Sequence, residues 1–169
     1  MKFKAVIHLL SFVTMIFGAT MAATAGVSWA MGDPAPAWHG MMYSALSNIL
    51  IGLLVWATTR GTFELSRREG IGIVVFGWFF AALSGAVPFL LCGAMDNPFD
   101  ALFESVSGLT TTGASVMSNL ESHSRGILLW RAILHLLGGM GILVLVVAII
   151  PFLGVGGMQI FNAEATGPS

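Results

Sequence analysis

The chain has 169 residues, of which 56% are hydrophobic and 9% are charged, and its formal net charge is −1. Soluble domains carry about 25% charged residues, so this composition excludes an ordinary soluble domain and indicates an all-α membrane protein. The sequence contains no basic run of the kind that binds nucleic acid. Its single cysteine, Cys92, excludes a disulfide framework and a cysteine-based zinc site.

Four long apolar segments predict four transmembrane helices, at about residues 5–29, 39–58, 70–94 and 126–152. The first follows Lys2 and Lys4, which also fits a signal peptide that is cleaved near residue 25. An apolar run of about 20 residues spans a bilayer and exceeds the 7–15 residues of a signal peptide. We therefore favour an uncleaved helix, without excluding cleavage of residues 1–25.

The segment from residue 96 to residue 125 differs from the four apolar runs. Asn97 is expected to cap a short helix that starts at Pro98 and continues to about residue 107. At 1.5 Å per residue, such a helix crosses about half a bilayer. Gly108 is expected to end it, and a Thr-rich loop follows. Because lipid does not tolerate bare backbone, this pattern predicts one re-entrant pore helix and filter loop.

The positive charges predict one orientation for all four helices. Lys2 and Lys4 precede the first helix, and Arg60, Arg67 and Arg68 lie between the second and third. Positive loops remain cytoplasmic, so the N-terminus is expected inside and the filter loop is expected to open to the outside. We divide the chain into a transmembrane hairpin, a cytoplasmic loop, a helix–pore-loop–helix repeat and a cytoplasmic tail, at residues 1–60, 61–69, 70–157 and 158–169.

Several sequence blocks resemble one family. The segment 109–114, Trp130 with Arg131, and the Gly-rich segment 137–142 are similar to the first pore repeat of the Trk/Ktr/HKT potassium transporter superfamily. The segments 66–70, 151–159 and 163–168 resemble its bacterial TrkH type. The resemblance implies two leading helices and four pore repeats around one pore. This chain matches the leading helices and the first repeat, so we expect a piece of a longer protein, with a genuine short product as the alternative.

The potassium-filter pattern of this family implies the ion-binding residues. Thr111, Thr112, Gly113 and Ala114 would offer carbonyl oxygens to potassium, which is the only metal expected and would lie at Thr111 and Thr112. Thr110 would support them through its hydroxyl group. An ordinary polar connection between helices is the alternative. No cofactor is expected, because potassium is the transported ligand.

Arg131 lies within the fourth apolar segment and needs a partner there. Glu104 is the candidate, and the pair would tie the pore helix to the helix after it. The alternative is that Arg131 extends to the outer lipid headgroups. Acidic residues around the loop either attract cations or are solvated charges and helix caps; they are Asp96, Asp100, Glu104 and Glu121.

Several glycines and histidines are expected to have packing roles. Gly138, Gly139 and Gly141 are expected to permit close helix packing, with a gating hinge as the alternative. His135 is expected to be packed and hydrogen-bonded. The four histidines lie on different segments without the spacing of metal ligands, and they are His8, His39, His123 and His135.

The expected function is potassium uptake across the bacterial inner membrane, which is not an enzymatic reaction. The resemblance implies a homodimer and a cytoplasmic nucleotide-binding regulatory subunit of the TrkA type as partners. A second hypothesis is a non-conducting membrane protein that acts in assembly or regulation of a full-length transporter. The sequence leaves open whether transport is channel-like or a symport with protons or sodium.

Overall fold

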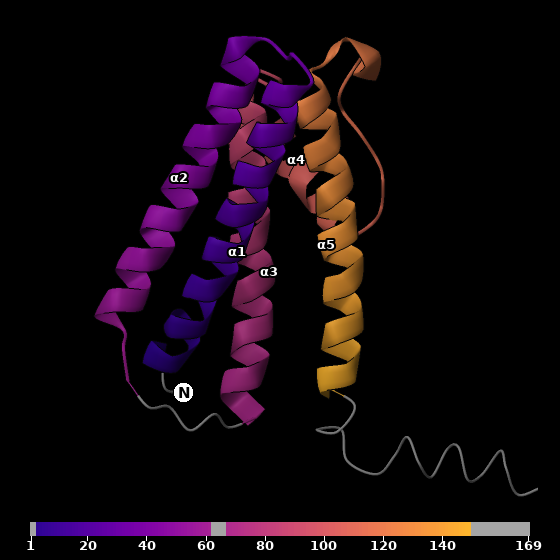
Figure 1. Ribbon diagram of the computed structural model, residues 1–169. Coiled ribbons are helices and arrows are strands. Elements are labelled where there is room, and N and C mark those ends of the chain that lie inside the picture. Colours follow the sequence, from indigo (N-terminus) through magenta and orange to yellow (C-terminus); the bar gives the residue numbers. More distant parts are fainter. Residues whose placement is uncertain (1–2, 62–66, 150–169) are drawn as a thin grey trace, which may run out of the picture.

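The computed structural model describes residues 3–61 and 67–149, which form helices and connecting turns (Figure 1). Within these two ranges there is no β-strand. The all-α fold expected from composition is therefore confirmed for this part of the chain. The elements in chain order are α1 (Phe3–Ala30), α2 (Ala35–Thr58), α3 (Arg67–Leu91), α4 (Pro98–Leu109), the short 3-10 helix η1 (Leu120–Ser122) and α5 (Arg125–Ile149).

Three of these helices are long and apolar enough to cross a membrane: α1, α2 and the part of α3 from Glu69 to Leu91. Their outward surfaces carry large apolar side chains, such as Leu54, which is 68% exposed, and Ile71, which is 63% exposed. Lipid is the solvent that suits such surfaces. The fourth predicted segment corresponds to α5, but its predicted end at residue 152 lies outside the described residues, as does the tail at 158–169.

Several helix limits differ from those expected from the sequence. α2 begins at Ala35 rather than at residue 39, because Pro36 lies in the first turn, where its missing N–H group is not needed. α3 begins at Arg67, so the predicted loop 61–69 includes the first residues of a helix. α3 ends at Leu91 rather than at residue 94, because Gly93 takes a positive φ of 68° and turns the chain.

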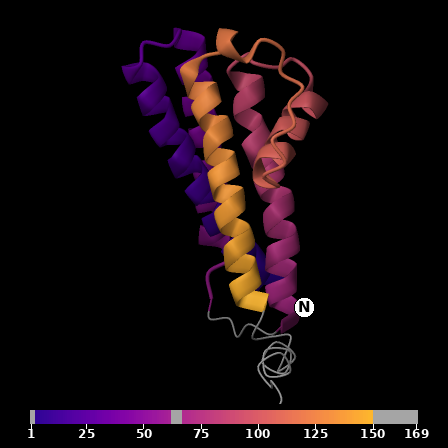
Figure 2. The same cartoon turned by 90° about the vertical axis from the view of Figure 1, so that its right-hand side faces the viewer.

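The helices form a bundle in which α1 lies between α2 and α3 (Figure 1). α4 lies in one half of the bundle only, against α3 and α5, and the chain after it runs back toward the same end (Figures 1 and 2). That end also carries the turn between α1 and α2. The buried core between the helices includes Trp130, whose indole N–H donates to the Gly85 carbonyl oxygen at 3.0 Å.

Polar contacts join the leading hairpin to the rest of the bundle, both within it and at its end. The Ser84 hydroxyl of α3 donates to the side-chain carbonyl of Asn48 on α2, and both residues are buried. At the end of the bundle, the Asp33 carboxylate accepts hydrogen bonds from the backbone N–H groups of Gly126 at 2.8 Å and Arg125 at 3.2 Å. Asp33 therefore caps the start of α5 from 92 residues away in the sequence.

Candidate functional site

The short helix α4 leads into the Thr-rich loop. Asn97 caps it as expected, since its side-chain oxygen accepts a hydrogen bond from the Phe99 N–H at 3.0 Å, and Pro98 is its first residue. Gly108 does not end it, contrary to the expectation. The helix continues to Leu109, and Gly108 is a buried residue within its last turn.

The residue that reverses the chain after α4 is Thr111, which has a φ of +56°. Its N–H donates to the Gly108 carbonyl at 2.9 Å, and the N–H of Thr112 donates to the Ser107 carbonyl at 3.0 Å. These two bonds form the paired closure that commonly ends helices with a glycine at the reversing position. A β-branched residue rarely adopts a positive φ, and such strained conformations concentrate at functional sites.

The carbonyl oxygens of Thr111, Thr112 and Gly113 accept no hydrogen bond from any residue that the structure describes. The N–H groups of the same three residues all donate back to α4, that of Gly113 to the Ser107 carbonyl at 3.4 Å. All three residues are exposed. Residues 111–114 form a segment outside any β-sheet, which we name the filter strand. Its first three carbonyl groups are thus accessible, while the amide groups of the same residues are already bonded.

The side chains of Ser107 and Thr110 form hydrogen bonds with this strand. The Ser107 hydroxyl donates to the Ala114 carbonyl oxygen at 2.6 Å, so the last carbonyl of the predicted filter already accepts one hydrogen bond. A carbonyl oxygen has two lone pairs, so the second is still available. The Thr110 hydroxyl donates to the Val106 carbonyl at 2.8 Å and lies 2.8 Å from the Thr112 hydroxyl. Thr110 therefore contacts the strand through its hydroxyl.

Glu104 is buried beneath the loop and is only 1% exposed. One of its carboxylate oxygens accepts hydrogen bonds from the Ser115 hydroxyl at 2.5 Å and from the N–H groups of Val116 at 2.7 Å and Met117 at 3.3 Å. The other oxygen lies 2.9 Å from Nε of Arg131. Glu104 is therefore not a solvated acidic group of the outer surface, because both of its carboxylate oxygens have partners inside the protein.

The partner expected for Arg131 from the sequence is the one that the structure gives. Within the described residues the two paired atoms, Nε of Arg131 and Oε2 of Glu104, have only each other as polar partners. The pair joins α5 to α4, while the other oxygen of Glu104 holds the returning strand. Three separate segments thus meet at one buried carboxylate.

Sequence reasoning missed the residues that hold the returning strand. Ser107 was recognised only as a part of the short helix, and Ser115, Val116 and Met117 were not proposed to contact Glu104. The signal in the sequence is a glutamate eleven to thirteen residues before these three positions, and it names no specific partner.

His135 lies behind the strand. Its Nδ1 atom is 2.9 Å from the Arg131 carbonyl oxygen, which is an ordinary bond within α5. A Cβ atom placed on Gly113 would lie 3.8 Å from Nε2 of the same ring. In the described part of the chain no group of three or more His, Cys, Asp or Glu side chains is arranged to hold a metal ion. His135 is thus a packed residue beside the loop.

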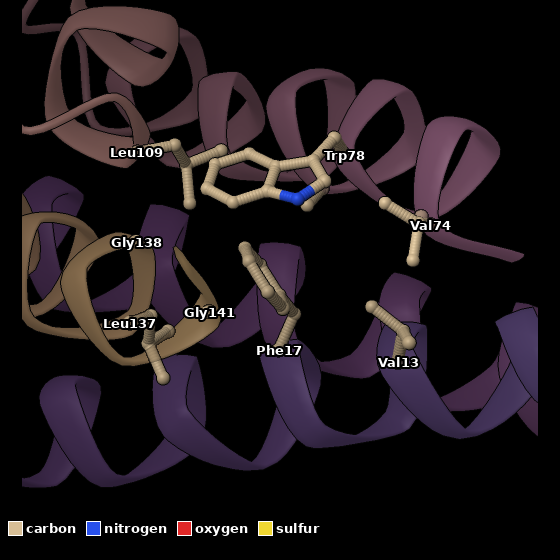
Figure 3. A pocket seen from close by; sticks show the side chains of 10 residues that line it. Val13, Phe17, Val74, Trp78, Leu109, Leu137, Gly138 and Gly141 are labelled. Carbon is tan, nitrogen blue, oxygen red and sulfur yellow. The ribbon is translucent and has the colours of Figure 1, made fainter. Parts of the chain in front are cut away.

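A cavity of about 210 Å³ lies below the end of α4, between α1, α3 and α5 (Figure 3). Figure 3 shows the side chains of Phe17 and Trp78 across this space, with Leu109 and Leu137 on its walls. These side chains are apolar apart from one indole N–H, which donates rather than accepts. The cavity therefore offers no side-chain ligands for a cation.

The sequence model of the TrkH family, described as a cation transport protein, matches residues 38–169. The Trk system potassium uptake proteins TrkH of Vibrio parahaemolyticus and of Escherichia coli K12 are each 40% identical to the chain over 99% of its length. The protein TrkG of Escherichia coli K12 is 40% identical over 70% of the chain. The chain spans about a third of the length of its TrkH relatives, since it covers 35% of each.

The fold has a solved counterpart. The crystal structure of the potassium transporter TrkH from Vibrio parahaemolyticus matches 98% of the chain with a TM-score of 0.85 and 37% sequence identity, and the chain covers 35% of that structure. Sequence and structure therefore agree on the family, which consists of transport proteins and not of enzymes. With helices suited to crossing a membrane, the chain is part of a multi-pass membrane protein and belongs to the TrkH family of cation transport proteins.

Proposed function

We propose that the chain supplies one of the filter strands of a potassium uptake pore. The strand is formed by Thr111, Thr112, Gly113 and Ala114, and a potassium ion would bind at the carbonyl groups of Thr111 and Thr112. The relatives that are named potassium uptake proteins support the identity of the ion. Since the chain covers 35% of those relatives, the other strands would come from sequence beyond this chain.

The observation that carries the proposal is the run of accessible carbonyl oxygens from Thr111 to Gly113. A potassium ion loses its hydration shell in a narrow filter, and rings of backbone carbonyls replace the water. Here the N–H groups bond back to α4, which leaves the carbonyl groups accessible on an exposed strand. A single strand supplies about a quarter of a fourfold ring, so ion binding needs the partner strands.

The same proposal includes the arrangement in the membrane. α5 has 25 residues and would be the fourth span. α4 has 12 residues, or about 18 Å at 1.5 Å per residue, and would enter the bilayer only to about half its depth. The loop would open to the outside, and the end of the bundle at which α1 and α3 begin would face the cytoplasm (Figure 1).

The partners proposed for the whole transporter follow from the resemblance to the TrkH type. They are a second copy of the transporter and a cytoplasmic nucleotide-binding subunit of the TrkA type, in the inner membrane of a bacterium. The described residues supply the filter strand and the helices that hold it. Coupling to protons or sodium is a property of the whole transporter and is not part of this proposal.

A chimera tests the proposed function. Residues 1–169 replace the aligned segment of Escherichia coli TrkH, and the chimera is produced in cells that lack their own potassium uptake systems. We expect growth at low potassium and uptake that prefers potassium to sodium. Replacing Gly113 with Ala should weaken that preference, because Gly113 has a φ of +76°, which an alanine tolerates poorly.

Gly93 provides the matched control, since it has a φ of +68° and, like Gly113, no close neighbour that a Cβ atom would displace. G93A imposes a similar backbone strain in a turn outside the filter, so its ion preference should equal that of the parent chimera. Equal ion preference in G113A, G93A and the parent would refute the filter assignment. A chimera that reaches the membrane in normal amounts but carries no potassium would favour a non-conducting role in assembly or regulation.

A further inference from the structure

The contact between α4 and α5 depends on glycine at one point. A Cβ atom added to Gly138 would lie 1.9 Å from the carbonyl oxygen of Leu109 and 2.5 Å from its carbonyl carbon. These are backbone atoms, which cannot rotate away as the end of a flexible side chain can. Any side chain at position 138 therefore requires the two helices to separate or slide.

The neighbouring glycines of α5 do not share this property. A Cβ atom on Gly139 would lie 3.7 Å from the side chain of Thr111, and one on Gly141 would lie 3.4 Å from the ring of Trp78. Both are contacts that a packed helix accepts with little or no movement. The three glycines look equivalent in the sequence, but only Gly138 is required by a backbone contact.

The contact at Gly138 lies directly before the filter strand. Leu109 is the last residue of α4, and the N–H groups of Thr110 to Gly113 bond to carbonyl groups of the preceding turn. The far end of the strand is also held by α4, because Ser107 donates to the Ala114 carbonyl and Glu104 accepts from Val116 just after the strand. The strand therefore moves with the end of α4, and the backbone contact between Leu109 and Gly138 fixes how closely that end approaches α5.

We propose that Gly138 is a positioning residue for ion selectivity, which sets the depth and lateral position of the filter strand by allowing the Leu109 carbonyl to rest on α5. This inference depends on the proposed filter function. If the strand were displaced, its carbonyl groups would no longer align with those of the strands that complete the ring. The carbonyl cage would then lose its discrimination between potassium and sodium while the bundle remained folded.

The test compares G138A, G139A and G141A in the chimera described above. For each variant, potassium and sodium uptake are measured and divided by the amount of folded protein in the membrane. We expect a several-fold loss of the potassium-to-sodium ratio in G138A, and a ratio equal to the parent in G139A and G141A. A purely structural role would lower the amount of protein and leave the ratio unchanged, and that result would overturn the inference.

A second variant covers the case in which G138A does not accumulate. A Cβ atom on Gly108 would lie 2.8 Å from the Cβ atom of Leu134, at the same crossing of α4 and α5. G108A should therefore cause a smaller loss of the potassium-to-sodium ratio, and an unchanged ratio would again overturn the inference. The proposed function fails separately, if the parent chimera does not transport potassium or if G113A behaves as the parent does.

Discussion

Glu104 connects three parts of the site, the pore helix, the returning strand and α5, through one carboxylate that is 1% exposed. A buried charge is tolerated when it is paired and hydrogen-bonded, and Glu104 has three donors on one oxygen and Arg131 at the other. The strand after Ala114 is therefore held by electrostatics and not by regular secondary structure. The loop can be rigid without being part of a helix or a sheet.

Removing this carboxylate should destabilise the protein. Breaking a buried pair by deleting one partner costs about 3–5 kcal/mol in soluble proteins, so E104A should strongly lower the midpoint of thermal unfolding of the purified chimera. E104Q should lower it less, because its amide oxygen still accepts from the strand. A midpoint for E104A equal to that of the parent would contradict the geometry.

A double-mutant cycle isolates the ion pair. E104Q and R131Q are measured singly and together, and the double variant should be more stable than the sum of the single losses predicts, because each single variant leaves one buried charge unpaired. Purely additive effects on unfolding and on transport would show that the two side chains act independently.

Cys92 is partly buried at the end of α3, and its thiol donates to the Ala37 carbonyl oxygen at 3.0 Å. Burial raises the pKa of Cys92 to about 12, although a hydrogen bond from the Met41 backbone acts in the opposite direction. The thiolate is the reactive form, so alkylation by a maleimide at neutral pH should be slow. Mass spectrometry follows the reaction, with S118C in the exposed loop as the fast control; equal rates would refute the burial of Cys92.

The sequence was sufficient to predict some of these residues and not others. Asn97 was predicted as a cap because capping is a local property of a few adjacent residues. Glu104 is a candidate partner for Arg131 because a charge inside a membrane needs one, with extension of Arg131 to the lipid headgroups as the alternative. Gly108 was expected to end the helix because glycine usually does so, but Thr111 has that role and Gly108 serves contact with Leu134. Which residue ends the helix depends on packing between helices, and no local sequence pattern indicates that packing.

At the scale of whole elements, α5 starts under a cap supplied by the turn between α1 and α2. The Asp33 carboxylate accepts from Ser28, Gly126 and Arg125. This long-range contact fastens the leading hairpin to the helix that follows the filter. No spacing in the sequence indicates it, because the residues involved are 92 and 93 positions apart.

The cap at Asp33 should make the stability of the folded protein depend on pH. Burial raises the pKa of Asp33, but the hydrogen bonds from Ser28, Gly126 and Arg125 outweigh it, so the net pKa lies below its ordinary value. A lowered pKa means that the stabilisation is complete above the unfolded pKa and is lost as the pH falls through the folded pKa. D33N should therefore show a smaller loss of unfolding temperature than the parent between neutral and acidic pH.

The exposed Asp96 supplies the control for this experiment. D96N should retain the acid dependence of the parent, whereas D33N should lower stability at neutral pH by about 0.3–1 kcal/mol, the usual value of a negative charge at a helix N-terminus. Parallel acid profiles for D33N and the parent would indicate that the cap is absent.

Asn48 makes a buried polar contact between α2 and α3. Its amide N–H donates to the Ser44 carbonyl at 2.9 Å, and its carbonyl accepts from Ser84. Hydrogen bonds between membrane helices contribute about 0.6 kcal/mol on average and up to about 1.7. S84A should therefore lower the unfolding temperature modestly. S47A is the matched control, since Ser47 bonds only to the Ser44 carbonyl of its own helix, and equal effects would contradict the interhelical bond.

In the whole molecule, the accessible carbonyl groups lie on the exposed strand. The loop lies on the side of the bundle away from α2 (Figure 1). The all-helical, membrane-spanning class followed directly from composition and hydropathy. The exact position of the strand did not, because it depends on the single backbone contact at Gly138 and on one buried carboxylate.

The most direct test of the filter assignment is to locate the ion. Crystals of the chimera grown with rubidium, a potassium substitute with a strong anomalous signal, should show an anomalous peak on the pore axis, lined by the carbonyl oxygens of Thr111 and Thr112. The G113A variant should show a weaker or displaced peak. A parent chimera with well-ordered loops but no peak at these carbonyl groups would contradict the account.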